Sequence, residues 1–126
     1  MPPQEHVSDM KNTRLDTLLH RFTVAALAHY ESLEAMDETG ANRHAAMISR
    51  LLASILCEGD DGSRGLAGLI EHDNPVVAGM AAVCVLDLHT KCALTVLKAL
   101  AKQDGMLGFR ASVAIERWQN GEWRRP

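Results

Sequence analysis

The sequence predicts an all-α protein, with about six helices in three antiparallel hairpins that stack as a short α-α superhelix. The first supporting observation is the stretch 66–88, LAGLIEHDNPVVAGMAAVCVLDL. It reads as an apolar helix, a polar turn and a second helix rich in Ala and Val. The second is composition. Aromatic residues make up only 4 % of the chain, so the core must be built from Leu, Ala, Val, Ile and Met.

The third observation is an internal repeat at a spacing of 30 residues, which needs no gap. The turn residue Pro75 corresponds to Gly105, and such a match is harder to obtain by chance than matching apolar periodicity. Stacked hairpins of this size bury the face of each unit against its neighbours. The other matched pairs are Leu66 and Val96, Ala67 and Leu97, Ile70 and Leu100, Val77 and Leu107, Ala81 and Ala111, Val83 and Val113, and Val85 and Ile115.

The first helix is expected after a polar segment. Residues 1–12 indicate a flexible leader, and Thr13 can cap the helix, with Asp16 three residues later in the capping-box position. Apolar residues then recur at helical spacing to about Met36, where an acidic segment with a glycine ends the helix. A second helix is expected over about residues 41–57. Its predicted buried face consists of Ala45, Ile48, Leu51, Leu52, Ile55 and Leu56.

The remaining helices lie within the repeat. Residues 58–62, Glu-Gly-Asp-Asp-Gly, predict a loop, after which Ser63 can cap a third helix over about residues 64–72. Pro75 stands where a fourth helix begins, a position that tolerates its missing N–H. The expected ranges of the last three helices are about 75–88, 93–102 and 107–119.

The length and charge of the chain limit the number of domains and the classes of partner that it can have. The 126 residues suffice for one domain, here 13–119, and residues 120–126 are expected to be a flexible tail. The net charge is −3, which divides into −6 over residues 1–75 and +3 over residues 76–126. No concentrated basic stripe matches nucleic-acid phosphates, and no apolar run approaches the roughly 20 residues of a membrane helix. We therefore expect neither nucleic acid nor membrane as a partner.

Cysteine and histidine usage indicates a cytoplasmic protein without a cofactor. Cys57, Cys84 and Cys92 show no CxxC spacing, and the polar N-terminal residues lack the apolar core of a signal peptide. His89 and Cys92 are the only closely spaced pair of metal-ligand type, whereas zinc needs about four ligands. No nucleophile elbow or phosphate-binding glycine loop is present. The expectation is no metal, no cofactor and no enzymatic activity.

Three segments carry a family resemblance: HDNPVVAGMAAVCVLDLHTKCALTVLKALAKQ at residues 72–103, the Ala-Asn-Arg entry to the second helix at 41–43, and the closing residues 108–118. Together they resemble the bacterial HEAT-like family catalogued as domain of unknown function 2019. The resemblance covers roughly residues 15–123 and implies a HEAT-like α-α superhelix without catalytic residues. Ala78 stands where the HEAT pattern usually has an arginine, which weakens the expectation of regular stacking.

Small solitary HEAT-like families often look like interaction modules, including immunity proteins encoded beside bacterial toxins. The resemblance and the charge distribution together predict a non-enzymatic protein-binding module, an immunity protein that occludes a basic toxin domain. The binding surface would be acidic, since acid-rich loops attract cationic partners and speed the encounter. The predicted partner-binding residues are Asp37, Glu38, Glu58, Asp60 and Asp61, together with Trp123.

Trp123 leaves two interpretations open. Flanked by Arg124 and Arg125 on a terminal segment, it can anchor a partner or a second copy of the chain. It can equally pack back on Trp118, which falls on the apolar face of the sixth helix. The alternative function is accordingly a structural homo-oligomer, such as a homodimer, or a subunit of a larger assembly.

Overall fold

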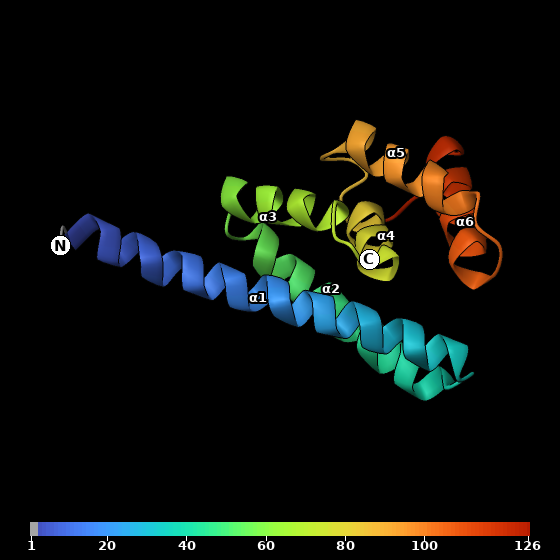
Figure 1. Cartoon of the computed structure of the whole chain (residues 1–126), viewed down its shortest axis with the longest axis horizontal. Coiled ribbons are helices and arrows are strands. Elements are labelled where there is room, and N and C mark those ends of the chain that lie inside the picture. Colours follow the sequence, from blue (N-terminus) through green and yellow to red (C-terminus); the bar gives the residue numbers. More distant parts are fainter. Residues whose placement is uncertain (1–2) are drawn as a thin grey trace.

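The computed structural model describes the backbone of residues 3–126 and the side chains from residue 13 onward. This part of the chain is all-helical, as predicted, and its helices follow one another in three hairpins, formed by α1 and α2, α3 and α4, and α5 and α6. α1 and α2 run antiparallel side by side, whereas α4 and α6 cross α3 and α5 steeply (Figure 1). The helices are α1 (Pro3–Glu34), α2 (Glu38–Leu56), α3 (Asp60–Ile70), α4 (Pro75–Cys84), α5 (Thr90–Ala101) and α6 (Met106–Gln119).

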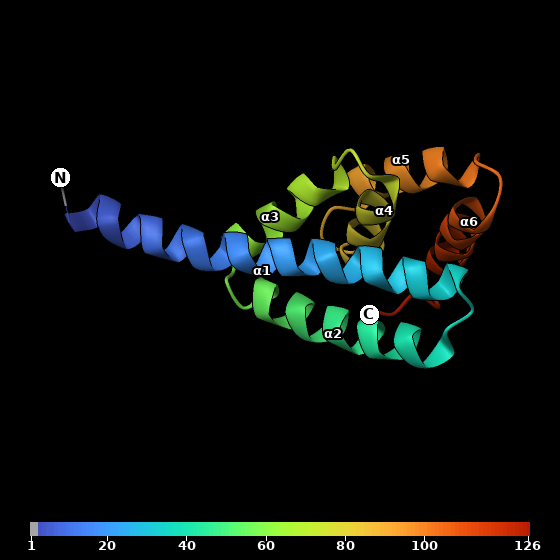
Figure 2. The ribbon, with the colours of Figure 1, turned by 60° about the horizontal axis from the view of Figure 1, so that its bottom comes forward.

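The first hairpin is the longest, and the N-terminal part of α1 extends beyond the other helices (Figure 2). The predicted start of α1 at Thr13 is wrong, because the helix already begins at Pro3. Thr13 lies inside it, and its carbonyl accepts a hydrogen bond from the Thr17 hydroxyl at 2.9 Å. Proline suits a first helical position, and the Gln, Glu, Met and Lys that follow are good helix formers. The segment expected to be a flexible leader is therefore helical from residue 3 onward.

α2, α3 and α5 also start three or four residues earlier than predicted, because their first turns lack the apolar periodicity that predicts a helix. Asp37 caps α2, and its carboxylate accepts a hydrogen bond from the Gly40 backbone N–H at 2.9 Å. α3 begins at Asp60, so Ser63 is not its cap. Acidic residues in a first turn are favoured by the helix dipole, which explains the early starts of α2 and α3 but not that of α5, whose first turn has no acid. Pro75 does open α4, as predicted, behind the cap Asn74.

The core lies where the three hairpins meet. α4 is its central element, since it is buried on most of its circumference, and its small residues allow neighbouring helices to approach closely. The first hairpin contributes Phe22 and the large aliphatic residues of α2. The largest fully buried side chains are Phe22, Ile48, Leu52, Ile55, Leu66, Val77, Cys84, Val85, Leu86 and Leu97.

The predicted repeat corresponds to the second and third hairpins. Their first helices begin 30 residues apart, at Asp60 and Thr90, and α4 packs against α5. The matched pair Ala81 and Ala111 is buried in both hairpins, as are Ile70 and Leu100. Two of the eight matched pairs are thus buried at equivalent positions, in hairpins that pack against each other.

Residues 120–126, for which the sequence predicts a flexible tail, contact α4 through Trp123. The Trp123 indole N–H donates a hydrogen bond to the Val83 carbonyl at 2.9 Å. The Trp123 ring meets the Trp118 ring edge to face, with centroids 5.6 Å apart. The Arg125 guanidinium forms an ion pair with Asp87, one hydrogen bond of which spans 3.0 Å. The contacts with Val83 and Asp87 join residues 40 and 38 positions apart, so helical periodicity could not reveal them. The packing of Trp123 on Trp118 is one of the two arrangements expected from the sequence.

Candidate docking cleft

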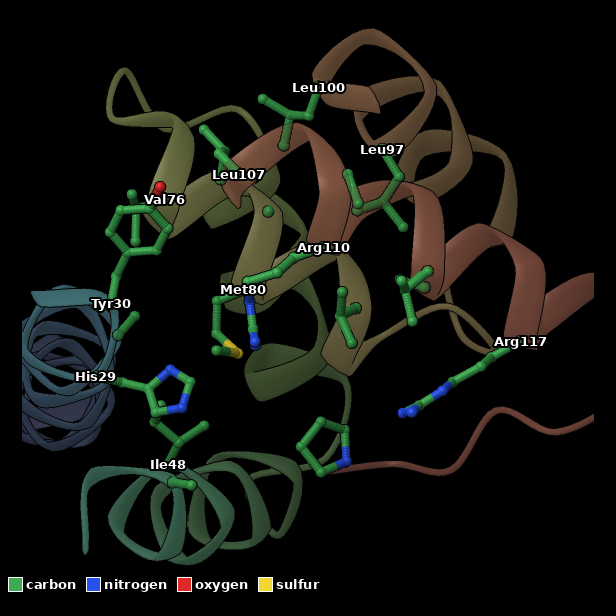
Figure 3. Close-up of a pocket in the computed structure, with 18 of the residues that line it drawn as sticks. His29, Tyr30, Ile48, Val76, Met80, Leu97, Leu100, Leu107, Arg110 and Arg117 are labelled. Carbon is green, nitrogen blue, oxygen red and sulfur yellow. The ribbon is translucent and has the colours of Figure 1, made fainter. Parts of the chain in front are cut away.

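A cleft of about 760 Å³ lies between the first hairpin and the pair α4 and α6 (Figure 3). α1 and α2 form one wall, α6 forms the opposite wall and α4 forms the floor. Residues 122–126 form one lip, and α5 contributes two leucines from behind α4. The side chains that define its chemistry are His29 and Tyr30 of α1, Ile48 of α2, Val76 and Met80 of α4, and Arg110 and Arg117 of α6.

Helical periodicity explains why these residues share one surface. On α6, Leu107, Arg110, Ala111, Ala114 and Arg117 recur at spacings of three, four and seven, which place them on one face. Within this face the apolar side chains lie toward the core and the two arginines lie at the solvent edge.

The floor of the cleft depends on a small residue in α4. A Cβ atom on Gly79 would lie 3.0 Å from Leu100 Cδ1, so the glycine lets α4 and α5 approach closely. The Met80 side chain beside it is apolar and flexible, and such side chains adapt to differently shaped partners. The cleft therefore combines an apolar floor with polar rims.

The charges of the cleft are mainly positive. Arg110, Arg117, Arg124 and Arg125 all line it, whereas Glu122 is the one acidic side chain among the lining residues. Arg125 is already paired with Asp87. Among the described residues, Arg110 and Arg117 form no ion pair and no hydrogen bond through their side chains. Two guanidinium groups without a carboxylate partner in this part of the chain thus lie along one wall.

His29 is the most deeply buried polar group of the cleft, with 9 % of its surface exposed. Burial lowers its pKa, and the positive charge of Arg110 and the neighbouring His44 lower it further. Burial also lowers the pKa of Arg110, against an opposing effect of Tyr30, but a guanidinium stays protonated in proteins. At neutral pH the cleft therefore holds a neutral imidazole beside a cationic guanidinium.

The predicted acidic surface is not one surface. Asp37 and Glu38 lie at the N-terminus of α2, whereas Glu58, Asp60 and Asp61 follow its C-terminus. A helix of 19 residues separates the two groups by about 28 Å. Figure 2 shows these two ends of α2 far apart along the first hairpin.

Several of these acids also have structural partners. Asp37 is the cap of α2. Glu58 accepts two hydrogen bonds from Arg14, at 2.9 and 3.1 Å, and only 10 % of its side chain is exposed. Asp61 forms an ion pair with Arg64 at 2.5 Å. Glu38 and Asp60 are exposed in the first turns of their helices. Of the six predicted residues, Trp123 alone lines the cleft.

Sequence reasoning missed His29, Arg110 and Arg117. A signal was present on α6, because Arg110 and Arg117 are seven residues apart on the face that carries Ala111 and Ala114. His29 follows Phe22 by seven and Ala26 by three residues, so it shares their buried face. No local pattern shows that these two faces oppose each other, since the hairpin packing brings them together.

Outside the cleft, the Ser63 hydroxyl and His89 Nε2 are hydrogen-bonded at 2.8 Å. Neither residue lines the cleft, and no carboxylate among the described residues bonds to the His89 ring. The contact joins the first turn of α3 to the residue that precedes α5. It connects the two stacked hairpins, and it explains the position of Ser63 without a capping role.

Among the described residues, no three or more His, Cys, Asp or Glu side chains converge in a way that could hold a metal ion. None of the helices between residues 3 and 126 combines the length and apolar character needed to cross a bilayer. Comparison with protein-family models, curated proteins and solved structures finds no match. The resemblance to the HEAT-like family stays a prediction, and the cleft is the feature from which a function can be inferred.

Proposed function

We propose that the protein is a non-enzymatic protein-binding module whose docking surface is the cleft between the first hairpin and α4 and α6. The observation that supports this most directly is the combination of an apolar floor with Arg110 and Arg117, neither of which has a carboxylate partner among the described residues. Apolar surface supplies the binding energy of most interfaces, while complementary charges set orientation and association rate. Protein binding, the function predicted from the sequence, is thus retained, but the proposed binding surface is the cleft and not the acidic residues.

The proposed occupant is an acidic amphipathic segment of a partner protein. Arg110 and Arg117 are seven residues apart, so about 10 Å separates them along α6. A helix with carboxylates two turns apart matches this spacing and can pair with both arginines at once. Apolar side chains on the same face of that helix would enter between them, toward Met80 and Val76. Recognition of this kind is common for amphipathic helices in apolar grooves.

The mechanism is occlusion by a preformed surface. A partner that docks its acidic segment here would have that segment covered by the first hairpin and the tail. The neutralisation of a toxin remains one form that such binding can take, with the charges reversed from those predicted. Trp123 favours this interpretation over self-association through the tail, because its ring is engaged with Trp118 and its N–H with Val83.

Selection from a random peptide display library tests the proposal with the full chain tethered at its N-terminus. We expect the selected peptides to carry Asp or Glu two turns apart, with Leu, Phe or Met between them. A double variant, Arg110→Ala with Arg117→Ala, should weaken the best peptide about tenfold, taking about 0.7 kcal/mol for each exposed ion pair. Lys98→Ala, on α5 outside the cleft, is the matched control.

The proposal fails if the selected peptides are basic. It also fails if the double arginine variant binds the best acidic peptide as tightly as the Lys98→Ala control does. Binding that is lost instead on charge reversal of Glu38 and Asp60 would restore the acidic surface as the docking site. Glu38 and Asp60 suit this comparison because, unlike Asp37 and Glu58, they are exposed and their side chains form no hydrogen bond or ion pair with any described residue.

A further inference from the structure

The inner part of the cleft holds a polar group without a partner in the described part of the chain. His29 is more than nine-tenths buried, and neither of its ring nitrogens is hydrogen-bonded to any described residue. Its ring points into the cavity, as Figure 3 shows, with Ile48 and Met80 beside it. Among the described residues, no side-chain nitrogen or oxygen is both shut off from solvent and without a partner, so the ring nitrogens of His29 are reachable from the cavity. They can therefore form hydrogen bonds with a ligand that enters it.

The partner must be compatible with the charges around it. The Arg110 guanidinium reaches into the cavity on the side of His29 (Figure 3), and electrostatic interactions connect His29 with both Arg110 and His44. α4 presents only apolar side chains to this region. The titratable and charged groups that line the cleft around His29, or interact with it, are Tyr30, His44, Arg110, Arg117, Glu122, Arg124 and Arg125.

We propose that His29 and Arg110 form a carboxylate-binding subsite inside the cleft, and that His29 takes up a proton when the carboxylate binds. The subsite rests on the proposed docking function, since the carboxylate is taken to be an acidic side chain of the docking segment. One oxygen accepts from the imidazole N–H and the other from the guanidinium, an arrangement of charge-assisted hydrogen bonds. The surrounding apolar side chains favour a carboxylate on an apolar chain over a free, strongly hydrated anion.

The proton uptake follows from the change in surroundings. In the free protein, burial and the nearby positive charge keep the pKa of His29 low, so the ring is neutral at pH 7. A carboxylate in contact with the ring favours the imidazolium form and raises this pKa. Because the complex then binds more protons than the free protein, affinity must increase as the pH falls toward the free-state pKa of His29. A carboxylate bound elsewhere in the cleft, away from His29, would show no such dependence.

The test uses two small probes that need no knowledge of the partner. Octanoate offers a carboxylate on an apolar chain, and 1-octanol offers the same chain without charge. The pKa of His29 is followed by NMR from its imidazole proton shift in the full chain, with the His29→Gln variant identifying the signal. We expect octanoate to raise the pKa of His29 and 1-octanol not to do so. Arg110→Ala should weaken octanoate binding about threefold, the effect of losing one exposed ion pair, while Lys98→Ala leaves it unchanged.

The pH dependence supplies a second readout. Octanoate should bind the native chain more tightly at pH 6 than at pH 7.5, and the His29→Gln variant should lose this difference while retaining its fold. An unchanged pKa of His29, or an equal effect of 1-octanol, overturns the subsite. Inorganic phosphate that displaces octanoate at equal concentration would overturn the assignment to a carboxylate.

The two proposals can fail separately. If a selected acidic peptide docks in the cleft but octanoate leaves His29 unaffected, the subsite is wrong and the docking function stands. If octanoate raises the pKa of His29 but display selection yields no acidic peptide, the subsite stands and the docking function is wrong.

Discussion

Replacing Gly62 with alanine should destabilise the protein, although alanine is the better helix former. Gly62 is the third residue of α3 and is buried against the end of α2. A Cβ atom at this position would lie 1.8 Å from the Ile55 carbonyl oxygen and 2.8 Å from its carbonyl carbon. Both atoms belong to the backbone of α2, so no side chain can rotate to make room. The start of α3 would have to move away from the end of α2.

The magnitude follows from two opposing terms. Alanine in a helix is favoured over glycine by about 1 kcal/mol. Inserting a methyl group into a closely packed site costs about 1–3 kcal/mol, and the upper end applies because backbone must move. Gly62→Ala should therefore lower the free energy of unfolding by about 1–2 kcal/mol. Gly68, six residues later in α3, is exposed, and a Cβ atom there would meet no atom within 4 Å, so Gly68→Ala should raise the free energy of unfolding by about 0.5–1 kcal/mol.

Urea denaturation followed by circular dichroism measures both variants. With a slope of about 1.5 kcal/mol per molar urea, the midpoint of Gly62→Ala should fall by about 1 M, while that of Gly68→Ala rises slightly. Since both substitutions lie in the same helix, their opposite signs isolate the contact with Ile55. If Gly62→Ala were as stabilising as Gly68→Ala, the described packing of α3 against α2 would be wrong.

Three further predictions concern the tail, the cleft and the core. Trp123→Ala should lower the free energy of unfolding by about 2 kcal/mol, because it removes the ring pair with Trp118 and the hydrogen bond to Val83, each worth about 1 kcal/mol. An unchanged urea midpoint would contradict the contacts of the tail with α4 and α6. Below pH 6.5 the unfolded chain protonates His29 more readily than the folded chain does, so the free energy of unfolding should decrease with falling pH. His29→Gln should reduce this decrease between pH 6.5 and 5, and equal pH profiles would refute the low folded-state pKa. Burial raises the pKa of Cys84 to about 12. At pH 8 a thiol reagent should therefore modify the two exposed cysteines and reach Cys84 only after unfolding. Rapid modification of all three cysteines would contradict the burial of Cys84.

Much of the fold could be predicted from local signals. Helical spacing of apolar residues identified the six helices, Pro75 marked the start of α4, and the 30-residue repeat identified the two stacked hairpins. The predicted helix starts were less accurate, because polar first turns such as the one at Asp60 have no regularly spaced apolar residues. The structural role of Ser63 depends on His89, 26 residues away, and no local pattern contains that information.

The site was predictable only in part. Clusters of acids suggested a binding surface, but the structure uses Asp37 as a cap and Glu58 as a partner of Arg14. Both uses depend on backbone geometry or on tertiary contacts. The cleft exists because α1 and α6, which are distant in sequence, face each other across α4. The spacing of Arg110 and Arg117 was visible in the sequence, whereas the opposing position of His29 was not.

The most direct test of docking in the cleft is a titration of the isotope-labelled protein with an acidic peptide from the display selection, followed by NMR of the backbone amides. If the cleft is the docking surface, the largest chemical-shift changes should occur within residues 26–30 of α1, 76–83 of α4 and 107–117 of α6. Changes concentrated at Asp37, Glu38 and Asp60, with the cleft unaffected, would contradict it.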